Sequence, residues 1–171
     1  SNSPASLASR PIAILLLDEV DRFPSSAGSE GSPIELAIKR TQTFSDRKII
    51  ITSTPTEKGS SVIDDYFLEG TQTFFHVACH ECGTFQKLLW KNVRWEKGKP
   101  NTAKYECSHC GSHWNDAQRW TSLQNYKAID TYPERSIKSF AFSEIYSPWS
   151  KLGEMAERFL RMQNKNWQKL F

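Results

Sequence analysis

The chain has 171 residues, of which 38% are apolar and 24% are charged, so it is large and apolar enough for a globular domain with a buried core. No run of about 18 apolar residues is present, which argues against a membrane span, and Ser1–Arg10 lacks the pattern of a signal peptide. The net charge of +3 only weakly favours a nucleic-acid partner, and the whole excess comes from residues 151–171.

The first predicted element is a strand that ends in two acids. Ile12–Leu17 are all apolar and run directly into Asp18 and Glu19. An apolar run without alternation is typical of a central parallel strand with both faces buried. The pattern matches a Walker B motif, in which one acid helps to hold Mg²⁺ and the next orients or deprotonates the attacking water. The alternative is a buried strand that ends in a solvated acidic turn.

A helix is predicted after the flexible loop Ser25–Gly31. Ser32 is a good N-cap, Pro33 suits the first helical position, and Glu35 completes the sequence pattern of a capping box. We expect this helix to end near Phe44–Asp46.

A second buried strand, Lys48–Thr52, follows and leads into Ser53-Thr54-Pro55-Thr56. Strand, helix and strand predict a right-handed βαβ unit with parallel strands, whose carboxyl ends lie at one edge of the sheet. We therefore expect Asp18 and Glu19 to face one crevice with the hydroxyls of Ser53 and Thr54. The alternative for Ser53 and Thr54 is an ordinary turn rich in hydroxyls.

The rest of the chain is predicted to mix short strands and helices. The predicted elements are a helix over Val62–Glu69, a strand over Thr71–Ala78, a helix capped by Asn115, a turn over Lys127–Tyr132, a strand over Ile137–Phe142, a bend at Tyr146–Ser150 and a final helix from about Ser150. The final helix carries an apolar stripe at helical spacing, made of Leu152, Met155, Ala156, Phe159 and Leu160.

Four cysteines form two Cys-x-x-Cys-Gly pairs, separated by 24 residues. Two residues between thiolates let both sulfurs face one ion, and the glycine permits the tight turn behind them. The pairs Cys79/Cys82 and Cys107/Cys110 therefore predict a structural Zn²⁺ site with four thiolate ligands. Two disulfides or four free thiols are the alternatives, and the absence of a secretory pattern favours a reducing compartment.

Other residues near the cysteines and in the final helix have two interpretations each. We interpret four histidines as supporting or surface residues, because four thiolates already complete a tetrahedron: His76, His80, His109 and His113. Three tryptophans, which could stack on bases, are interpreted as core: Trp90, Trp95 and Trp114. Five basic residues of the final helix form either its solvated face or a contact with DNA or another subunit. They are Lys151, Arg158, Arg161, Lys165 and Lys169.

The chain has no G-x-x-x-x-G-K-[ST] loop, which would hold a triphosphate against Asp18 and Glu19. It also has no Ser-His-Asp set and no dinucleotide-binding glycine pattern. Either the phosphate-binding loop lies upstream in a longer parent protein, or the two acids are not part of an ATPase site.

The order of the motifs resembles the large terminase subunit of tailed phages, in the lambda-like GpA family. The resemblance rests on Leu15–Asp21, on Ser53–Thr56 after a strand, on the two cysteine pairs and on Tyr146-Ser147-Pro148-Trp149. Walker B and the Ser-Thr-Pro-Thr segment are shared with many helicase-like motors. Their combination with the cysteine pairs and the Tyr-Ser-Pro-Trp stretch is more specific.

The resemblance implies a fragment of a DNA-packaging motor that couples ATP hydrolysis to the movement of double-stranded DNA. Asp18 would be associated with Mg²⁺, Glu19 would act on water, and Ser53 and Thr54 would sense the γ-phosphate of ATP. The parent would also contain an endonuclease and would work with a small terminase subunit and a portal protein in the host cytoplasm. Because it lacks the phosphate-binding loop, this fragment alone is expected to be inactive.

The predicted fold is α/β, the C-terminal half of a P-loop NTPase-type parallel sheet with an inserted zinc-ribbon β module. The predicted boundaries are 1–71 for the Walker B part of the ATPase core, 72–114 for the ribbon, and 115–171 for the return to that core. Two alternatives remain: a non-enzymatic zinc-ribbon module that binds nucleic acid or protein, and a helicase-like ATPase of another lineage.

Overall fold

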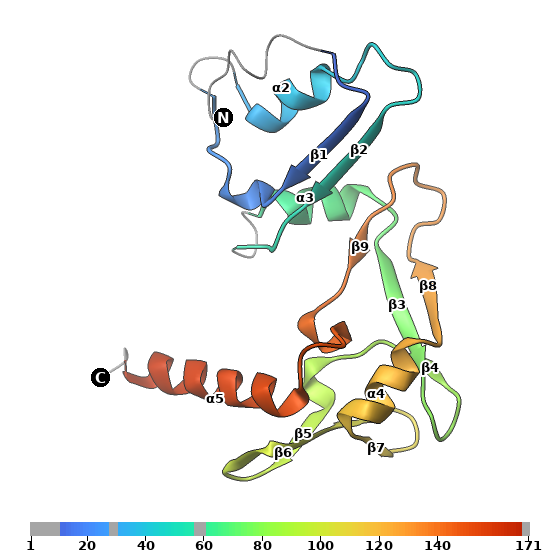
Figure 1. The fold of residues 1–171 in the computed structure, drawn as a ribbon, viewed down its shortest axis with the longest axis vertical. Helices are drawn as coiled ribbons and strands as arrows, with labels where there is room; N and C mark the ends of the chain where they lie inside the picture. The colour runs from blue at the N-terminus through green and yellow to red at the C-terminus, as the bar shows by residue number, and fades with distance from the viewer. Residues whose placement is uncertain (1–10, 28–30, 57–60, 169–171) are drawn as a thin grey trace. The chain divides into compact units, whose positions relative to one another are not determined.

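The computed structural model describes residues 11–27, 31–56 and 61–168, with side chains up to residue 163 (Figure 1). The chain is mixed α/β and divides into two compact units, Ser1–Glu69 and Gly70–Phe171. Among the described residues, no helix combines the length and apolar character that a crossing of a bilayer would require.

The first unit is built on two parallel strands, as predicted. Strand β1 (Ile14–Asp18) pairs in parallel with β2 (Lys48–Thr52), from Ile14 opposite Lys48 to Asp18 opposite Thr52. Helix α2 (Pro33–Lys39) connects them, the 3₁₀ turn η1 (Val20–Arg22) follows β1, and α3 (Val62–Glu69) ends the unit with the predicted bounds.

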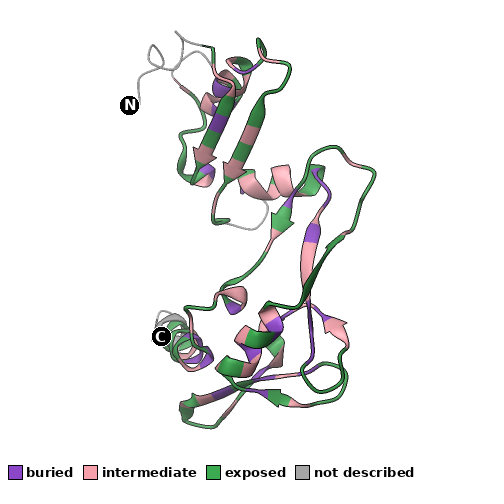
Figure 2. Ribbon diagram, turned by 45° about the vertical axis from the view of Figure 1, so that its right-hand side comes forward, coloured by how far each residue is buried: buried purple, intermediate pink, exposed green. Residues whose placement is uncertain are grey.

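The β1–β2 sheet is covered on only one face within the described residues. Leu15 of β1 and Ile34 of α2 are buried, and α2 contacts β1. Figure 2 shows buried positions in both elements. On the opposite face, the exposed fractions are 64% for Ile14, 67% for Leu16 and 51% for Ile50. The prediction that both faces of β1 are buried is therefore not met within the described residues of the first unit, because none of its elements covers the second face.

Helix α2 is shorter than predicted and lacks the predicted capping box. Pro33 occupies the first turn as expected, but the Ser32 side chain makes no cap hydrogen bond. The helix ends at Lys39 rather than near Phe44–Asp46, because the next residues form i→i−3 bonds. The buried Thr41 reinforces this end, since its hydroxyl donates to the Ile38 carbonyl at 2.7 Å.

The second unit contains two small sheets. In the first, β3 (Thr73–Ala78) lies between β4 (Phe85–Gln86) and β8 (Tyr126–Asp130), and β9 (Phe140–Ala141) pairs in parallel with β3. The second sheet is antiparallel, and its strands are β5 (Val93–Glu96), β6 (Lys99–Glu106) and β7 (His113–Trp114).

Two elements of the second unit differ from the predictions. The segment expected as a turn over Lys127–Tyr132 is largely strand β8, because its first four residues, Lys127–Asp130, pair with β3. The strand expected over Ile137–Phe142 is reduced to Phe140–Ala141, the only part that pairs with β3 among the described residues.

Helices and 3₁₀ turns of the second unit pack on these sheets. Helix α4 (Asp116–Leu123) begins with a complete capping box between Asn115 and Gln118. The 3₁₀ turns are η2 (Trp90–Asn92) and η3 (Glu144–Tyr146), and the final helix α5 spans Leu152–Gln168.

Helix α5 runs along the β5–β6 hairpin and completes the core of the second unit (Figure 1). The buried stripe residues Leu152, Met155 and Ala156 belong to one apolar cluster with Tyr105 and Trp114, which confirms the predicted apolar face of this helix. Gly153 allows the close approach, because a Cβ there would lie 3.1 Å from the Asn101 Cα.

Candidate functional site

The carboxyl ends of β1 and β2 bring an acid and a hydroxyl together. Asp18 ends β1 and Thr52 ends β2, and the two residues are paired in the register. Asp18 Oδ1 accepts hydrogen bonds from Thr52 Oγ1 at 2.5 Å and from the Glu19 amide at 3.0 Å. The Asp18 carboxylate is thus exposed at the sheet edge and held in one orientation.

Glu19 turns the chain sharply after the strand. Its φ of 55° lies in the left-handed region, which costs a non-glycine residue on the order of 1 kcal/mol. The exposed Glu19 carboxylate pairs with Arg22 at 3.0 Å. The turn directs the chain into η1. Asp18 is therefore still part of the β1–β2 pairing, whereas Glu19 precedes the 3₁₀ turn.

The segment after β2 contacts the turn after β1. The Ser53 hydroxyl accepts a hydrogen bond from the Asp21 amide at 3.2 Å. Thr54 is exposed, and its side chain makes no hydrogen bond among the described residues. The structure therefore puts Asp18, Glu19, Ser53 and Thr54 near one edge of the β1–β2 sheet, while the contact to the turn is made by Ser53.

Sequence reasoning missed Asp21 and Thr52. Asp21 accepts hydrogen bonds from the Thr56 amide at 2.9 Å, the Thr56 hydroxyl at 3.1 Å and the Ile63 amide at 2.8 Å. The sequence feature that could have indicated the Asp21 contacts is an acid two residues after Glu19, together with the hydroxyl-rich segment Ser53–Thr56 after the next strand. No periodicity argument assigns partners to such an acid.

The four cysteine sulfurs meet in the second unit. All four Sγ atoms lie within 4.8 Å of one another. A tetrahedral zinc with Zn–S bonds of ~2.3 Å requires sulfurs ~3.8 Å apart. The separations are 3.8 Å for Cys79 and Cys110, and 3.9 Å for Cys82 and Cys107. No cysteine is in a disulfide, so the chain's thiols fit a tetrahedral metal better than the disulfide alternative.

The two cysteine pairs have the same local backbone. In each pair the first cysteine carbonyl accepts from the glycine amide, from Gly83 at 2.9 Å and from Gly111 at 3.1 Å. Both glycines have positive φ, +70° and +73°, which other residues adopt only with strain. These turns also point amides at sulfur, with Glu81 N and His109 N each 3.4 Å from the first sulfur of their pair.

The surroundings of the four thiols are not equivalent. Burial raises the pKa of Cys79, but amide groups of Cys82 and Glu81 and the Ser112 hydroxyl outweigh it and lower this pKa to about 6. Burial raises the pKa of Cys107 despite similar amide contacts. Ser112 lowers the pKa of Cys110. The surroundings of Cys79 and Cys110 thus favour the thiolate form that a metal requires more than those of an ordinary cysteine do.

One side chain outside the four sulfurs joins the two cysteine pairs. The buried Gln86 follows the first pair and donates to Cys107 Sγ at 3.1 Å. Its side-chain oxygen Oε1 accepts from the Ser108 amide at 2.9 Å. Gln86 therefore orients the second cysteine turn, a role that the sequence analysis did not assign.

The neighbouring histidines and tryptophans support the site rather than complete it. No histidine joins the sulfur cluster among the described residues. His80 packs against Trp114, with ring centres 5.6 Å apart. Trp114 is fully buried, and Trp90 and Trp95 both pack against Phe159 of α5. This confirms the interpretation of these tryptophans as core.

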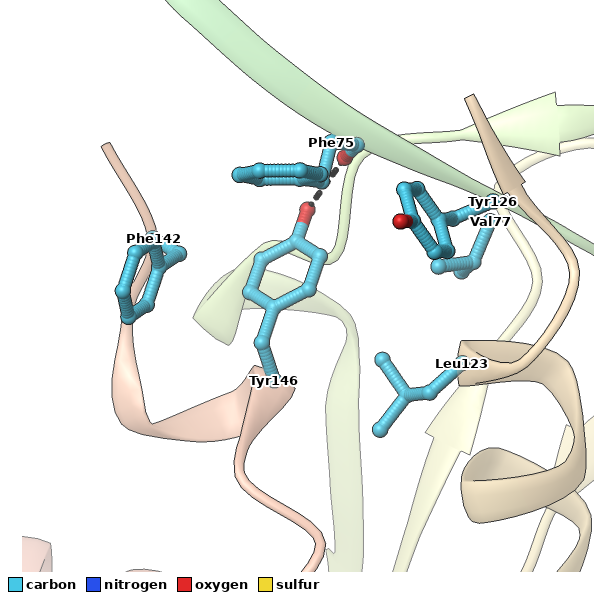
Figure 3. A pocket seen from close by; sticks show the side chains of 6 residues that line it. All are labelled: Phe75, Val77, Leu123, Tyr126, Phe142 and Tyr146. Carbon is cyan, nitrogen blue, oxygen red and sulfur yellow. Dashed lines mark hydrogen bonds between the residues drawn. The ribbon is translucent and has the colours of Figure 1, made fainter. Parts of the chain in front are cut away.

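A shallow apolar pocket of about 210 Å³ lies on the β3–β8 sheet (Figure 3). Tyr146 stands in it with its hydroxyl donating to the Phe75 carbonyl at 2.8 Å and accepting from the Leu88 amide. The lining residues carry no carboxylate, thiol or imidazole, and their only side-chain polar groups are the hydroxyls of Tyr126 and Tyr146. The residues that line the pocket are Phe75, Val77, Leu123, Tyr126, Phe142 and Tyr146.

Comparisons with known proteins agree with the family resemblance. Residues 1–127 match the family described as phage terminase large subunit gpA, ATPase domain. The chain is 33% identical over 109 residues to the terminase large subunit of Enterobacteria phage P21, an alignment that covers 60% of the chain and 17% of that relative. It is 32% identical over 99 residues to the terminase large subunit of Escherichia phage lambda, covering 54% of the chain and 15% of that relative.

The chain therefore aligns with less than a fifth of the length of either relative. No solved structure matches it significantly. The family match covers most of the chain and includes Asp18, Glu19 and both cysteine pairs. This chain therefore belongs to the phage terminase large subunit gpA family and carries part of its ATPase domain.

Proposed function

We propose that this chain is the Walker B and coupling part of a DNA-packaging ATPase. The observation that carries the proposal is the shared edge of β1 and β2, where Asp18, Glu19 and the Ser53–Thr56 segment converge. Asp18 would hold Mg²⁺, Glu19 would act on the attacking water, and Ser53 and Thr54 would sense the γ-phosphate. The phosphate-binding loop that holds ATP would come from another segment of the full protein.

The uncovered face of β1 and β2 supports a larger sheet. Ile14, Leu16 and Ile50 form an exposed apolar face beside an open strand edge, a combination that isolated soluble domains avoid. We assign these strands to the C-terminal half of a P-loop NTPase-type parallel sheet. Residues 1–71 would belong to that core, with 72–114 as the inserted ribbon and 115–171 as the return.

ATP turnover tests the proposal. The chain joined to its upstream region should hydrolyse ATP, and Glu19→Gln should lower kcat by about 100-fold or more, because a general base contributes on that scale. Glu134→Gln, which changes an exposed glutamate in a turn of the second unit, should leave kcat unchanged. Absence of turnover in the wild type would favour the non-enzymatic ribbon instead, whereas full turnover by Glu19→Gln would overturn the role proposed for Glu19.

We also assign a structural Zn²⁺ to Cys79, Cys82, Cys107 and Cys110. Four thiolates leave no open coordination position, so the metal would brace the turns rather than catalyse. Metal analysis should find about one zinc per chain, and Cys82→Ser should lower that content and the unfolding temperature. Zinc-free protein with unchanged stability would refute the assignment.

The β5–β6 hairpin region is the surface on which we propose a contact with double-stranded DNA. Residues 87–106 carry six basic and two acidic residues. Both acids are already paired, Glu96 with Lys99 at 2.8 Å and Glu106 with Arg94 at 2.6 Å. Lys104 lies directly opposite Arg94 in the register, an arrangement of like charges that folding alone does not favour.

Salt dependence of DNA binding tests this surface. Each phosphate contact that is lost should reduce the slope of log affinity against log salt by about one. Lys97→Ala and Lys104→Ala together should therefore weaken binding to a duplex and flatten that slope, whereas Lys39→Ala, in the first unit, should not. Equal slopes for all variants would show that this surface does not bind the DNA, and that it contacts a protein partner or nothing.

For the whole protein, we propose the partners and location that the resemblance implies. These are the small terminase subunit and the portal protein in the cytoplasm of the host, with an endonuclease in a segment outside this chain. The curated relatives carry the name terminase large subunit, which supports this assignment.

A further inference from the structure

Asp21 connects three segments at the edge of the first unit. Its carboxylate accepts from the Thr56 amide and hydroxyl, at 2.9 and 3.1 Å, and from the Ile63 amide at 2.8 Å. Its own amide donates to Ser53 Oγ at 3.2 Å. One residue of η1 thus binds both ends of the described Ser53–Thr56 segment and the first turn of α3.

The contact with α3 satisfies a group that the helix itself leaves open. The amides in the first turn of a helix have no partner within the helix, and a carboxylate there is favoured by the helix dipole. Ile63 is the second residue of α3, and Ser61 is buried next to it. Burial raises the pKa of Asp21, but the bonds from Ile63, Ser61 and Thr56 outweigh it, so the pKa is lowered and the charged form is favoured.

The position of Asp21 depends on the turn that follows the nucleotide acids. Asp21 lies two residues after Glu19, whose left-handed backbone sets the direction of η1. A rearrangement of Glu19 at a triphosphate would therefore move Asp21, and with it Thr56 and α3. Helix α3 ends at Glu69, and the second unit begins with the next residue of the chain, Gly70.

We propose that Asp21 is a positioning residue that holds the Ser53–Thr56 segment and the start of α3 in register with Asp18 and Glu19, and that it transmits changes at the acids to α3. This inference rests on the proposed ATPase function. It assigns a role to the acid that follows the Walker B pair, and it names Thr56 as its main partner.

Two measurements separate this role from a merely structural one. In the chain itself, Asp21→Asn should raise the hydrogen exchange of the Thr56 or Ile63 amide by about tenfold or more, because Asn cannot accept from both donor sets through one carbonyl. In the chain joined to its upstream region, Asp21→Asn should lower kcat about tenfold or more. The KM for ATP should change little, because the role proposed for Asp21 involves no contact with the triphosphate.

Matched variants sharpen the test. Asp65→Asn changes an exposed acid of α3 and should alter neither amide exchange nor kcat. Thr56→Val removes the hydroxyl contact with Asp21 and should lower kcat, whereas Thr56→Ser keeps the hydroxyl and should restore it. If the role is merely structural, Asp21→Asn and Thr56→Val should lower the unfolding temperature but leave kcat per folded molecule unchanged. Thr56→Ser would then have no loss of kcat to restore.

The outcomes distinguish this inference from the proposed function. If Glu19→Gln abolishes turnover but Asp21→Asn keeps wild-type kcat, the positioning role is wrong and the ATPase assignment stands. If the Thr56 and Ile63 amides stay protected in Asp21→Asn, the contacts are dispensable and the inference is also overturned. If the wild type has no turnover, the ATPase assignment fails, and the role of Asp21 in that reaction fails with it.

Discussion

At the residue scale, Arg119 is the clearest example of a charge used to hold irregular backbone. Its side chain is fully buried and donates to the carbonyls of Ile145, Ser147 and Ser150, at 2.5, 3.1 and 2.5 Å. It also pairs with Asp116 at 3.0 Å. The bend that includes Tyr146-Ser147-Pro148-Trp149 therefore owes its shape to a residue of α4.

We expect Arg119→Met to cost about 3 kcal/mol or more of unfolding free energy, because three carbonyls and a partly buried carboxylate lose their partner. Urea unfolding of the metal-loaded chain measures this cost. Arg158→Met removes an exposed ion pair with Glu144 and should cost about 1 kcal/mol or less. A cost for Arg119→Met no larger than that of Arg158→Met would contradict this account.

The pH dependence of stability follows from Asp130. The Thr73 hydroxyl and Lys138 hold the pKa of Asp130 below its usual value of 3.8. A carboxyl with a lowered pKa in the folded state stabilises the fold above its unfolded pKa, and this contribution is lost as the pH falls through the folded pKa. The wild type should therefore be more stable than Asp130→Asn above about pH 4, and the difference should shrink below it.

Urea midpoints measured between about pH 3 and pH 6 test this expectation. Glu134→Gln, a change at an exposed turn residue, is the control and should run parallel to the wild type throughout. A difference between wild type and Asp130→Asn that does not vary with pH would show that the Asp130 contacts act through shape and not through charge.

At the element scale, the same local pattern had different outcomes in two helices. Ser32 and Glu35 match a capping box as well as Asn115 and Gln118 do, yet only the second pair forms one. Strand β8 gives the same lesson, since its sequence is turn-like and its pairing with β3 makes it a strand. Local patterns set preferences of about 1 kcal/mol, and long-range pairing outweighs them.

Helix α5 should contribute to stability through its buried stripe and not through its exposed face. Leu152→Ala should cost about 2–5 kcal/mol, because Leu152 is fully buried in the core. Met162→Ala, on the same helix, should change stability by less than about 0.5 kcal/mol, since Met162 is 59% exposed. Thermal or urea unfolding of both variants measures the contrast, and equal costs would mean that α5 does not close this core.

At the scale of the whole molecule, the two units differ in how complete their cores are. All members of the main apolar cluster lie between Val77 and Ala156, within the second unit. The first unit leaves Ile14, Leu16 and Ile50 exposed. The predicted boundaries at 71 and 114 stay a prediction, although Cys79 and Cys107 share one core with α5.

Residues 70–171 should therefore fold without the first unit. We expect the isolated segment, refolded with zinc, to unfold in one cooperative transition and to keep about one zinc per chain. The counterpart 1–69 should bind a dye for exposed apolar surface and should bind less of it after Leu16→Lys. An unfolded 70–171 segment in the presence of zinc would show that its core depends on the first unit.

The sequence by itself determined the elements whose signals are local: the apolar β1 and β2, α3, the cap of α4, the stripe of α5, and the two cysteine pairs that meet in space. These signals are dense enough to identify the family, because each motif needs only residues near it in the chain. Only the tertiary structure decided which face of β1 is covered, that Lys127–Tyr132 becomes mostly strand, and that Asp21, Gln86 and Arg119 each join distant segments. Such contacts depend on hydrogen-bond partners far apart in the chain, and no periodicity or spacing encodes them.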